Sequence, residues 1–215
     1  MAENKHTSYD LAQMQSLPLS VKVEMTKRRI QEWYEHWEGQ VYVSFSGGKD
    51  STVLKHIVDS MYDDVPSVFV DTGLEYPEVR KFVLDVRGGQ YPELRSNVEI
   101  LHPKMRFDEV IQTYGYPVIS KEVAGDVYGA KHGVAKNGDK TIRMKRLCGE
   151  VIAPDGKKSR FNKEKWKFLL NAPFEISDKC CAVMKKNPCK EYGQLTRRKE
   201  FTGMMAAESR VRKIT

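Results

Sequence analysis

The sequence predicts an α/β fold: a doubly wound, Rossmann-like parallel sheet with an irregular basic insert. Between residues 40 and 115, short runs rich in Val, Ile and Phe alternate with segments of helical spacing. A glycine-rich polar loop follows the first of these runs. The chain has 215 residues, 40% of them hydrophobic, which is enough for the core of one domain with an insert. Strands that alternate with helices imply a parallel sheet with helices on its faces.

The first elements follow from the spacing of the apolar residues. A helix is expected over 21–37, where apolar residues from Val21 to Trp37 recur at helical spacing. Three strands are expected in runs that are rich in β-branched residues, over 40–45, 66–73 and 97–103. Four helices are expected between and after these strands, over 50–62, 76–88, 106–115 and 120–131.

The second half of the chain has a less regular pattern. Residues 132–165 hold Gly, Asn, Asp and Lys without periodicity and are expected to form the irregular insert. A helix over 163–173, a strand over 199–206 and a helical segment over 207–213 are expected to follow. We therefore expect an N-terminal helical segment over 1–37 and one domain over 38–215, whose basic insert spans about 131–167.

The positive charge of the chain is concentrated in this insert. The net charge is +7, and residues 131–167 contain twelve Lys and Arg against four Asp and Glu, a net +8. A polyanionic partner such as nucleic acid would explain the excess, and so would a solvated insert without a partner. No apolar run approaches the length that spans a bilayer, and the N-terminus lacks the layout of a secretory signal. A cytoplasmic protein without a membrane partner is therefore expected.

The stretch SFSGGKDST, residues 44–52, predicts a phosphate-binding site. It lies at the carboxyl end of the first strand, where open α/β sheets bind ligands. Its two glycines let the backbone approach a ligand, and the lysine and the following helix N-terminus favour an anion. The common nucleoside triphosphate loop is excluded because Asp50 follows Lys49. The expected binding residues are Ser44, Ser46, Gly47, Gly48, Lys49, Asp50 and Ser51, with Lys49 and Asp50 as the expected catalytic residues.

The run SGGKDS resembles the pyrophosphate-binding loop (PP-loop) of the adenine nucleotide α-hydrolase-like superfamily, which includes ATP pyrophosphatases. The segment VFVDTGLEYPEV resembles the second strand and turn of the phosphoadenylylsulfate (PAPS) reductase family. The resemblance implies the adenine nucleotide α-hydrolase-like fold. It also implies that Asp71, Thr72 and Gly73 line the pocket of an adenine nucleotide, which would be PAPS, adenylylsulfate (APS) or ATP.

A third segment, TGMMAAESRVR, resembles the late motif of the same family. Gly203, Glu208, Ser209 and Arg212 match that motif, and the resemblance implies that they contribute to nucleotide binding. Met205 and Ala206 stand where the family carries a pair of arginines, which would neutralise an anionic substrate group.

The four cysteines are Cys148, Cys180, Cys181 and Cys189. Four are too few for a disulfide scaffold, and reduced thiols are expected. Some family members hold a [4Fe–4S] cluster with a cysteine pair and two further cysteines, although the later C-x-x-C spacing is absent here. Zinc and half-buried structural thiols are the alternatives.

The resemblance implies reductive release of sulfite from a sulfonucleotide, with a thiol reductant protein as electron donor. Reductases of this family use a cysteine on a C-terminal tail, and no cysteine follows Cys189. One alternative is an ATP pyrophosphatase that adenylates a substrate, such as RNA or DNA, for sulfur transfer or modification, with Mg²⁺ beside the phosphates. The other alternative is a nucleotide-binding module without catalysis.

Overall fold

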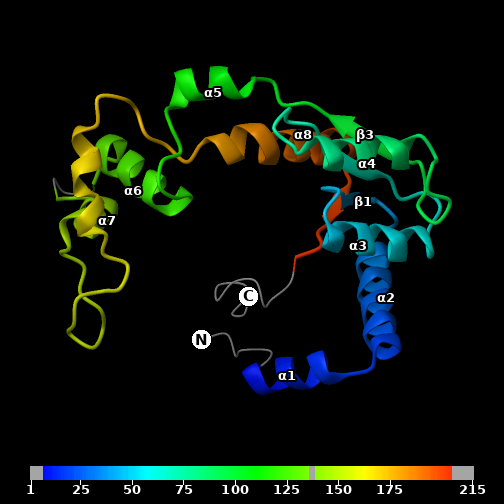
Figure 1. The fold of residues 1–215 in the computed structure, drawn as a ribbon. Helices are drawn as coiled ribbons and strands as arrows, with labels where there is room; N and C mark the ends of the chain where they lie inside the picture. Colours follow the sequence, from blue (N-terminus) through cyan, green and yellow to red (C-terminus); the bar gives the residue numbers. More distant parts are fainter. Residues whose placement is uncertain (1–6, 136–138, 205–215) are drawn as a thin grey trace. The chain divides into compact units, whose positions relative to one another are not determined.

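The computed structural model describes residues 7–135 and 139–204 and divides the chain into two compact units. The sheet unit consists of Met1–Leu101 and Cys189–Thr215, and the helical unit consists of His102–Pro188. Figure 1 shows the elements of both units, coloured along the sequence from blue at the N-terminus to red at the C-terminus. The predicted basic insert, 131–167, lies inside the helical unit.

The sheet unit contains four parallel strands in the order β3-β2-β1-β4. They are β1 (Val41–Ser44), β2 (Ser67–Val70), β3 (Val98–Leu101) and β4 (Lys199–Phe201). Its helices are α1 (Ser8–Ser16), α2 (Leu19–His36), α3 (Lys49–Asp59), α4 (Pro77–Arg87) and most of α8 (Asn187–Thr196). An all-parallel sheet with helices packed against it confirms the predicted α/β fold class.

Helices cover both faces of the sheet. Successive side chains of each strand point to opposite faces, so each strand packs against helices on both sides. On one face, Val41 and Val43 of β1 pack with Ile30 of α2 and Ile57 of α3 in a buried cluster. On the other face, Tyr42 packs with Val68 of β2 and with Tyr192 of α8. Burial on both faces explains why the strands appear in the sequence as nearly continuous apolar runs.

One buried ion pair lies beneath the first of these faces. Lys55 of α3 is fully buried and forms a 2.9 Å salt bridge with Asp59, one turn later. Its ammonium also donates to Ser67 Oγ at 3.0 Å and to Asn97 Oδ1 at 2.9 Å. Burial lowers the pKa of Lys55, and the Asp59 carboxylate opposes this shift. The pair therefore links α3 to β2 and to the segment that precedes β3.

The helical unit packs around a separate apolar core. It contains α5 (Phe107–Tyr114), α6 (Lys121–His132), α7 (Ile142–Cys148), the 3-10 helix η2 (Glu164–Asn171) and the π-helix η3 (Ala182–Lys186). Val127 of α6, Leu147 of α7, Leu169 of η2 and Ile176 form its centre. Within the described residues of both units, no helix has the length and apolar content that a bilayer crossing requires.

The expected strands over 40–45, 66–73 and 97–103 and the helices over 21–37, 50–62, 76–88, 106–115 and 120–131 are present, with ends shifted by a few residues. The prediction that 132–165 is irregular was wrong over α7, which Thr141 caps at its start and Gly149, with φ +73°, caps at its end. The helix expected over 163–173 is a 3-10 helix. Helix α1 lies inside the expected N-terminal helical segment, 1–37, and helix α8 was not predicted. The helix expected over 207–213 lies outside the described residues.

Candidate nucleotide-binding site

The predicted phosphate loop connects β1 to α3 at the carboxyl end of the sheet. Ser44, the last residue of β1, is half-buried, and Phe45 after it is buried. Helix α3 begins at Lys49, and its N-cap is Gly48, which offers no side chain to cap the first amides. The free N–H groups of a first helical turn carry partial positive charge and bind anions. The first turn of α3 is therefore open to a phosphate group.

Gly47 lets the loop turn tightly and approach α4. It has φ +72°, in the left-handed region that glycine adopts without a steric penalty. A Cβ at this position would lie 2.9 Å from Val79 Cγ1 and 2.9 Å from Val83 Cγ2, both on α4. Gly48 has ordinary backbone angles, and the nearest atom to a Cβ there is Ser46 Oγ at 3.5 Å. Gly47 is thus required by the fold, whereas Gly48 leaves space on the side where a ligand would approach.

Hydroxyl groups hold the loop in this conformation. Ser51 is buried, and its Oγ donates to the Gly48 carbonyl at 2.9 Å and accepts from the Ser46 amide at 3.2 Å. The Ser46 and Ser51 hydroxyl oxygens lie 3.0 Å apart. Thr52 Oγ1 also donates to the Gly48 carbonyl, at 2.9 Å. The loop is therefore preorganised by its own side chains, which lowers the entropic cost of binding a ligand.

The two expected catalytic residues lie in the first turn of α3. Lys49 is exposed and forms no salt bridge with any described carboxylate, so its ammonium is available to an anion. Asp50 is half-buried and is the acidic residue of this turn.

The predicted turn after β2 lies at the same edge of the sheet, because β1 and β2 are parallel neighbours. Asp71 is 6% exposed, and its carboxylate accepts from Arg80 Nε at 2.8 Å and from the Gly73 amide at 3.2 Å. Thr72 is also buried, and its hydroxyl donates to Glu75 at 2.8 Å. The turn is thus an ordered structure with a half-exposed cation, Arg80, at its border. Arg80 was not among the predicted site residues. Its position in the helix that follows the turn could have indicated that it lies near the site.

Gly203 of the late motif lies against the backbone of Asp50 and Ser51, next to the phosphate loop. A Cβ on Gly203 would lie 2.9 Å from the Asp50 carbonyl oxygen and 3.1 Å from the Ser51 amide nitrogen. Only a residue without a side chain allows the backbone after β4 to lie this close to α3. The other matched residues of this motif, Glu208, Ser209 and Arg212, lie outside the described residues.

The cysteines are divided between the units. Cys189 belongs to the sheet unit, and Cys148, Cys180 and Cys181 belong to the helical unit. All four are free thiols of intermediate burial. Burial raises the pKa of Cys180, with a further contribution from the adjacent Cys181 thiol, and burial followed by the charge of Glu200 raises the pKa of Cys189. The part of the chain that the structure describes contains no group of three or more His, Cys, Asp or Glu side chains arranged to hold a metal ion. The iron–sulfur or zinc site remains a prediction.

Comparison with known proteins finds similarity to one protein family over part of the chain. Residues 40–124 match the model of the phosphoadenosine phosphosulfate reductase domain. Two uncharacterized proteins of Methanocaldococcus jannaschii are 38% identical over 90 residues and 40% identical over 57 residues, which is 41% and 25% of this chain. An adenosine 5'-phosphosulfate reductase of Bacillus cereus is 28% identical over 82 residues, or 38% of this chain.

The matched segments cover 18%, 14% and 34% of the lengths of these three relatives. The similarity to these proteins therefore concerns only part of each of them. The segment that matches the reductase domain model, 40–124, includes the phosphate loop and the Asp71 turn. The match agrees with the resemblance found in the SGGKDS and VFVDTG motifs. Residues 40–124 of this chain are similar to the phosphoadenosine phosphosulfate reductase domain, and this similarity is consistent with the PP-loop superfamily.

Proposed function

We propose that the sheet unit binds an adenine sulfonucleotide, with a phosphate group at residues 46–51, and that the chain releases sulfite from it by reduction. The observation that carries this proposal is the preorganised loop at the open N-terminus of α3, inside the segment that matches the reductase domain family. The partial similarity to an adenosine 5'-phosphosulfate reductase supports the choice of substrate class.

In this proposal the loop and Lys49 bind and neutralise the phosphate. The first amides of α3 donate to its oxygens, and the Lys49 ammonium stabilises the charge that develops as the nucleotide leaves. Thr72 and Gly73 line the nucleotide from the neighbouring turn, and Asp71 holds that turn in place through Arg80 and the Gly73 amide.

The reaction requires two thiols or a thiol and an external reductant. A thiolate attacks the sulfur atom, the sulfur–oxygen bond to the nucleotide breaks, and the adenosine phosphate leaves with the bonding electrons. A second thiol then attacks the cysteine sulfur, which forms a disulfide and releases sulfite. A thiol reductant protein reduces the disulfide again. The raised pKa values of Cys180 and Cys189 disfavour these two residues as the first nucleophile, because only the thiolate attacks.

One observation favours a second candidate, an ATP pyrophosphatase. Cys189 belongs to the unit that carries the phosphate loop, and burial makes its thiol harder to ionise. In this second reaction a substrate oxygen attacks the α-phosphorus of ATP and pyrophosphate leaves, so no thiol is needed. Mg²⁺ would accompany the ATP phosphates, and Asp50 is the carboxylate within the loop.

The products distinguish the two reactions. Purified full-length chain is incubated with PAPS or APS and a dithiol, and separately with ATP and Mg²⁺. Sulfite together with the adenosine phosphate supports the reductase, and AMP with pyrophosphate supports the second candidate. Lys49→Ala is the matched control, since contaminating activity would survive this substitution. Nucleotide binding without either product would leave a binding module and contradict both reactions.

A further inference from the structure

The two units differ strongly in charge. The helical unit contains eighteen Lys and Arg and ten Asp and Glu, so its net charge is +8, whereas the net charge of the whole chain is +7. The sheet unit therefore has a net charge of −1, although the proposed nucleotide site lies there. An excess of positive charge of this size attracts an anionic partner to the helical unit, at a site separate from the phosphate loop.

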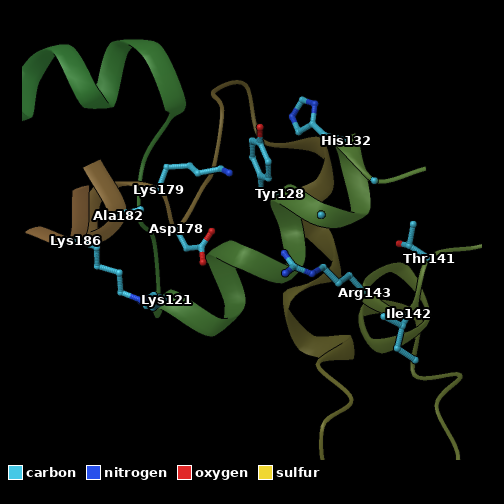
Figure 2. Close-up of a pocket in the computed structure, with 12 residues that line it drawn as sticks. Lys121, Tyr128, His132, Thr141, Ile142, Arg143, Asp178, Lys179, Ala182 and Lys186 are labelled. Atoms are coloured by element: carbon cyan, nitrogen blue, oxygen red, sulfur yellow. The ribbon is translucent and has the colours of Figure 1, made fainter. Parts of the chain in front are cut away.

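Part of this excess converges on a pocket of about 670 Å³ in the helical unit. Its lining includes the cations Lys121 of α6, Arg143 of α7, Lys179 and Lys186, together with the carboxylate Asp178 (Figure 2). None of these four cations forms a salt bridge with a described carboxylate. Other cations of the unit are neutralised locally, as in the 2.6 Å pair of Lys163 with the buried Asp126. The pocket thus gathers cations that the fold itself leaves uncompensated.

Gly129 lines this pocket, and Gly125 lies one turn earlier on α6. Gly125 and Gly129 lie on the same face of α6, and the Arg143 guanidinium crosses that face to donate to the Gly125 carbonyl. A Cβ on Gly129 would overlap the Arg143 side chain, and a Cβ on Gly125 would lie 3.1 Å from Asp178 Oδ2. The absence of both side chains lets Arg143 and Asp178 approach α6 beside the pocket.

Aromatic rings lie among the cations. Lys179 Nζ is 5.2 Å from the centre of the Tyr128 ring, and Figure 2 shows its side chain pointing toward that ring. Elsewhere in the unit, Phe161 is 47% exposed, with the Arg160 guanidinium 5.1 Å from its ring centre. Tyr128 is half-buried, and the centre of its ring lies 4.5 Å from that of His132, which also lines the pocket. Cations beside partly exposed aromatic rings are typical of surfaces that bind unpaired bases and neutralise the backbone.

We infer that the helical unit binds single-stranded nucleic acid, with a backbone phosphate in the pocket between Lys121, Arg143 and Lys186 and a base against Tyr128. A single phosphate monoester carries at most two negative charges and would leave most of the net +8 uncompensated. A polyanion matches this charge better. Bases can stack on aromatic side chains only where they are unpaired, which favours a single strand over a duplex.

Fluorescence anisotropy with a labelled single strand of about 20 nucleotides tests this inference on the full chain, over a range of salt concentrations. Each neutralised phosphate of a single strand contributes about −0.7 to the slope of log affinity against log salt. The variant Lys121→Ala/Lys186→Ala is expected to flatten that slope by about 1.4 and to weaken binding at low salt at least about fivefold. Tyr128→Leu is expected to weaken binding about tenfold without changing the slope, because it removes stacking and no charge.

The charge-matched control is Arg29→Ala/Arg87→Ala, which removes two exposed cations from the sheet unit and is expected to leave the slope unchanged. Circular dichroism establishes that each variant is folded. Lys49→Ala is expected to retain oligonucleotide binding, which separates this inference from the proposed reaction. Three results would overturn it: equal slopes for the pocket variant and the wild type, equal affinity for duplex and single strand, or displacement of the probe by millimolar inorganic phosphate.

Discussion

Replacement of Gly47 by alanine probes the contact that brings the phosphate loop against α4. The new methyl group meets two obstacles in the structure. The backbone at Gly47 has φ +72°, and the added Cβ would lie 2.9 Å from both Val79 Cγ1 and Val83 Cγ2. Val83 is fully buried, so its side chain has little room to move.

The two obstacles have separate energetic costs, and a second glycine distinguishes them. A left-handed backbone angle costs a residue with a Cβ about 1–2 kcal/mol. Overpacking of a buried contact costs typically about 1–3 kcal/mol more. Gly89, after α4, has φ +76°, and a Cβ there would have no neighbour within 4 Å. We therefore expect Gly47→Ala to lower the free energy of unfolding by about 2–5 kcal/mol and Gly89→Ala by only about 1–2 kcal/mol.

Urea unfolding of the sheet unit measures this difference. Trp33 and Trp37 belong to that unit and Trp166 to the helical unit, so a Trp166→Phe background makes tryptophan fluorescence report on the sheet unit alone. If Gly47→Ala destabilises the unit no more than Gly89→Ala does, the close approach of the loop to α4 is refuted as the reason for glycine at this position.

Three further predictions concern the loop, the buried ion pair and one thiol. Lys49→Ala and Gly48→Val are each expected to weaken adenine-nucleotide binding at least tenfold, about 1.4 kcal/mol, in calorimetric titration, and unchanged affinity in both would contradict the site. Asp59→Ala is expected to destabilise the sheet unit by about 3–5 kcal/mol in urea, because it leaves the Lys55 ammonium buried without its counter-ion. The double variant Lys55→Met/Asp59→Ala is expected to recover most of this loss, and equal stability of single and double variants would contradict the explanation. The Cys189 thiol has a raised pKa because it is buried, and it keeps its proton at pH values where an ordinary thiol ionises. Mass spectrometry is therefore expected to show slow alkylation that accelerates only at higher pH than alkylation of an ordinary thiol does. Alkylation of Cys189 at the rate of a short cysteine peptide would disprove that burial raises the pKa of its thiol.

Local patterns of the sequence were enough to predict most of the helices and strands of the sheet unit up to α4. The strands β1 and β2 and the helix between them could be predicted because burial on both faces of a parallel sheet leaves continuous apolar runs. The phosphate loop could be predicted because its chemistry lies within a few consecutive residues, from Ser46 to Ser51. Helix α7 was missed because seven residues give little periodicity, and its stability comes from packing at Leu147 rather than from helix propensity.

Contacts between residues far apart in the sequence were decided only by the tertiary structure. Lysine side chains are almost never fully buried unless paired, but the structure buries Lys55 beside Ser67 and Asn97. Gly203 is a motif glycine in the sequence, and the structure shows that it is needed because it meets the backbone of Asp50. The sequence located the basic excess at 131–167, whereas the structure brings Arg143 of that stretch together with Lys121, Lys179 and Lys186, which lie outside it. Local patterns determine the secondary structure and the chemistry of the phosphate loop. The burial of a charged side chain and the gathering of distant side chains at one site depend on which distant segments pack together.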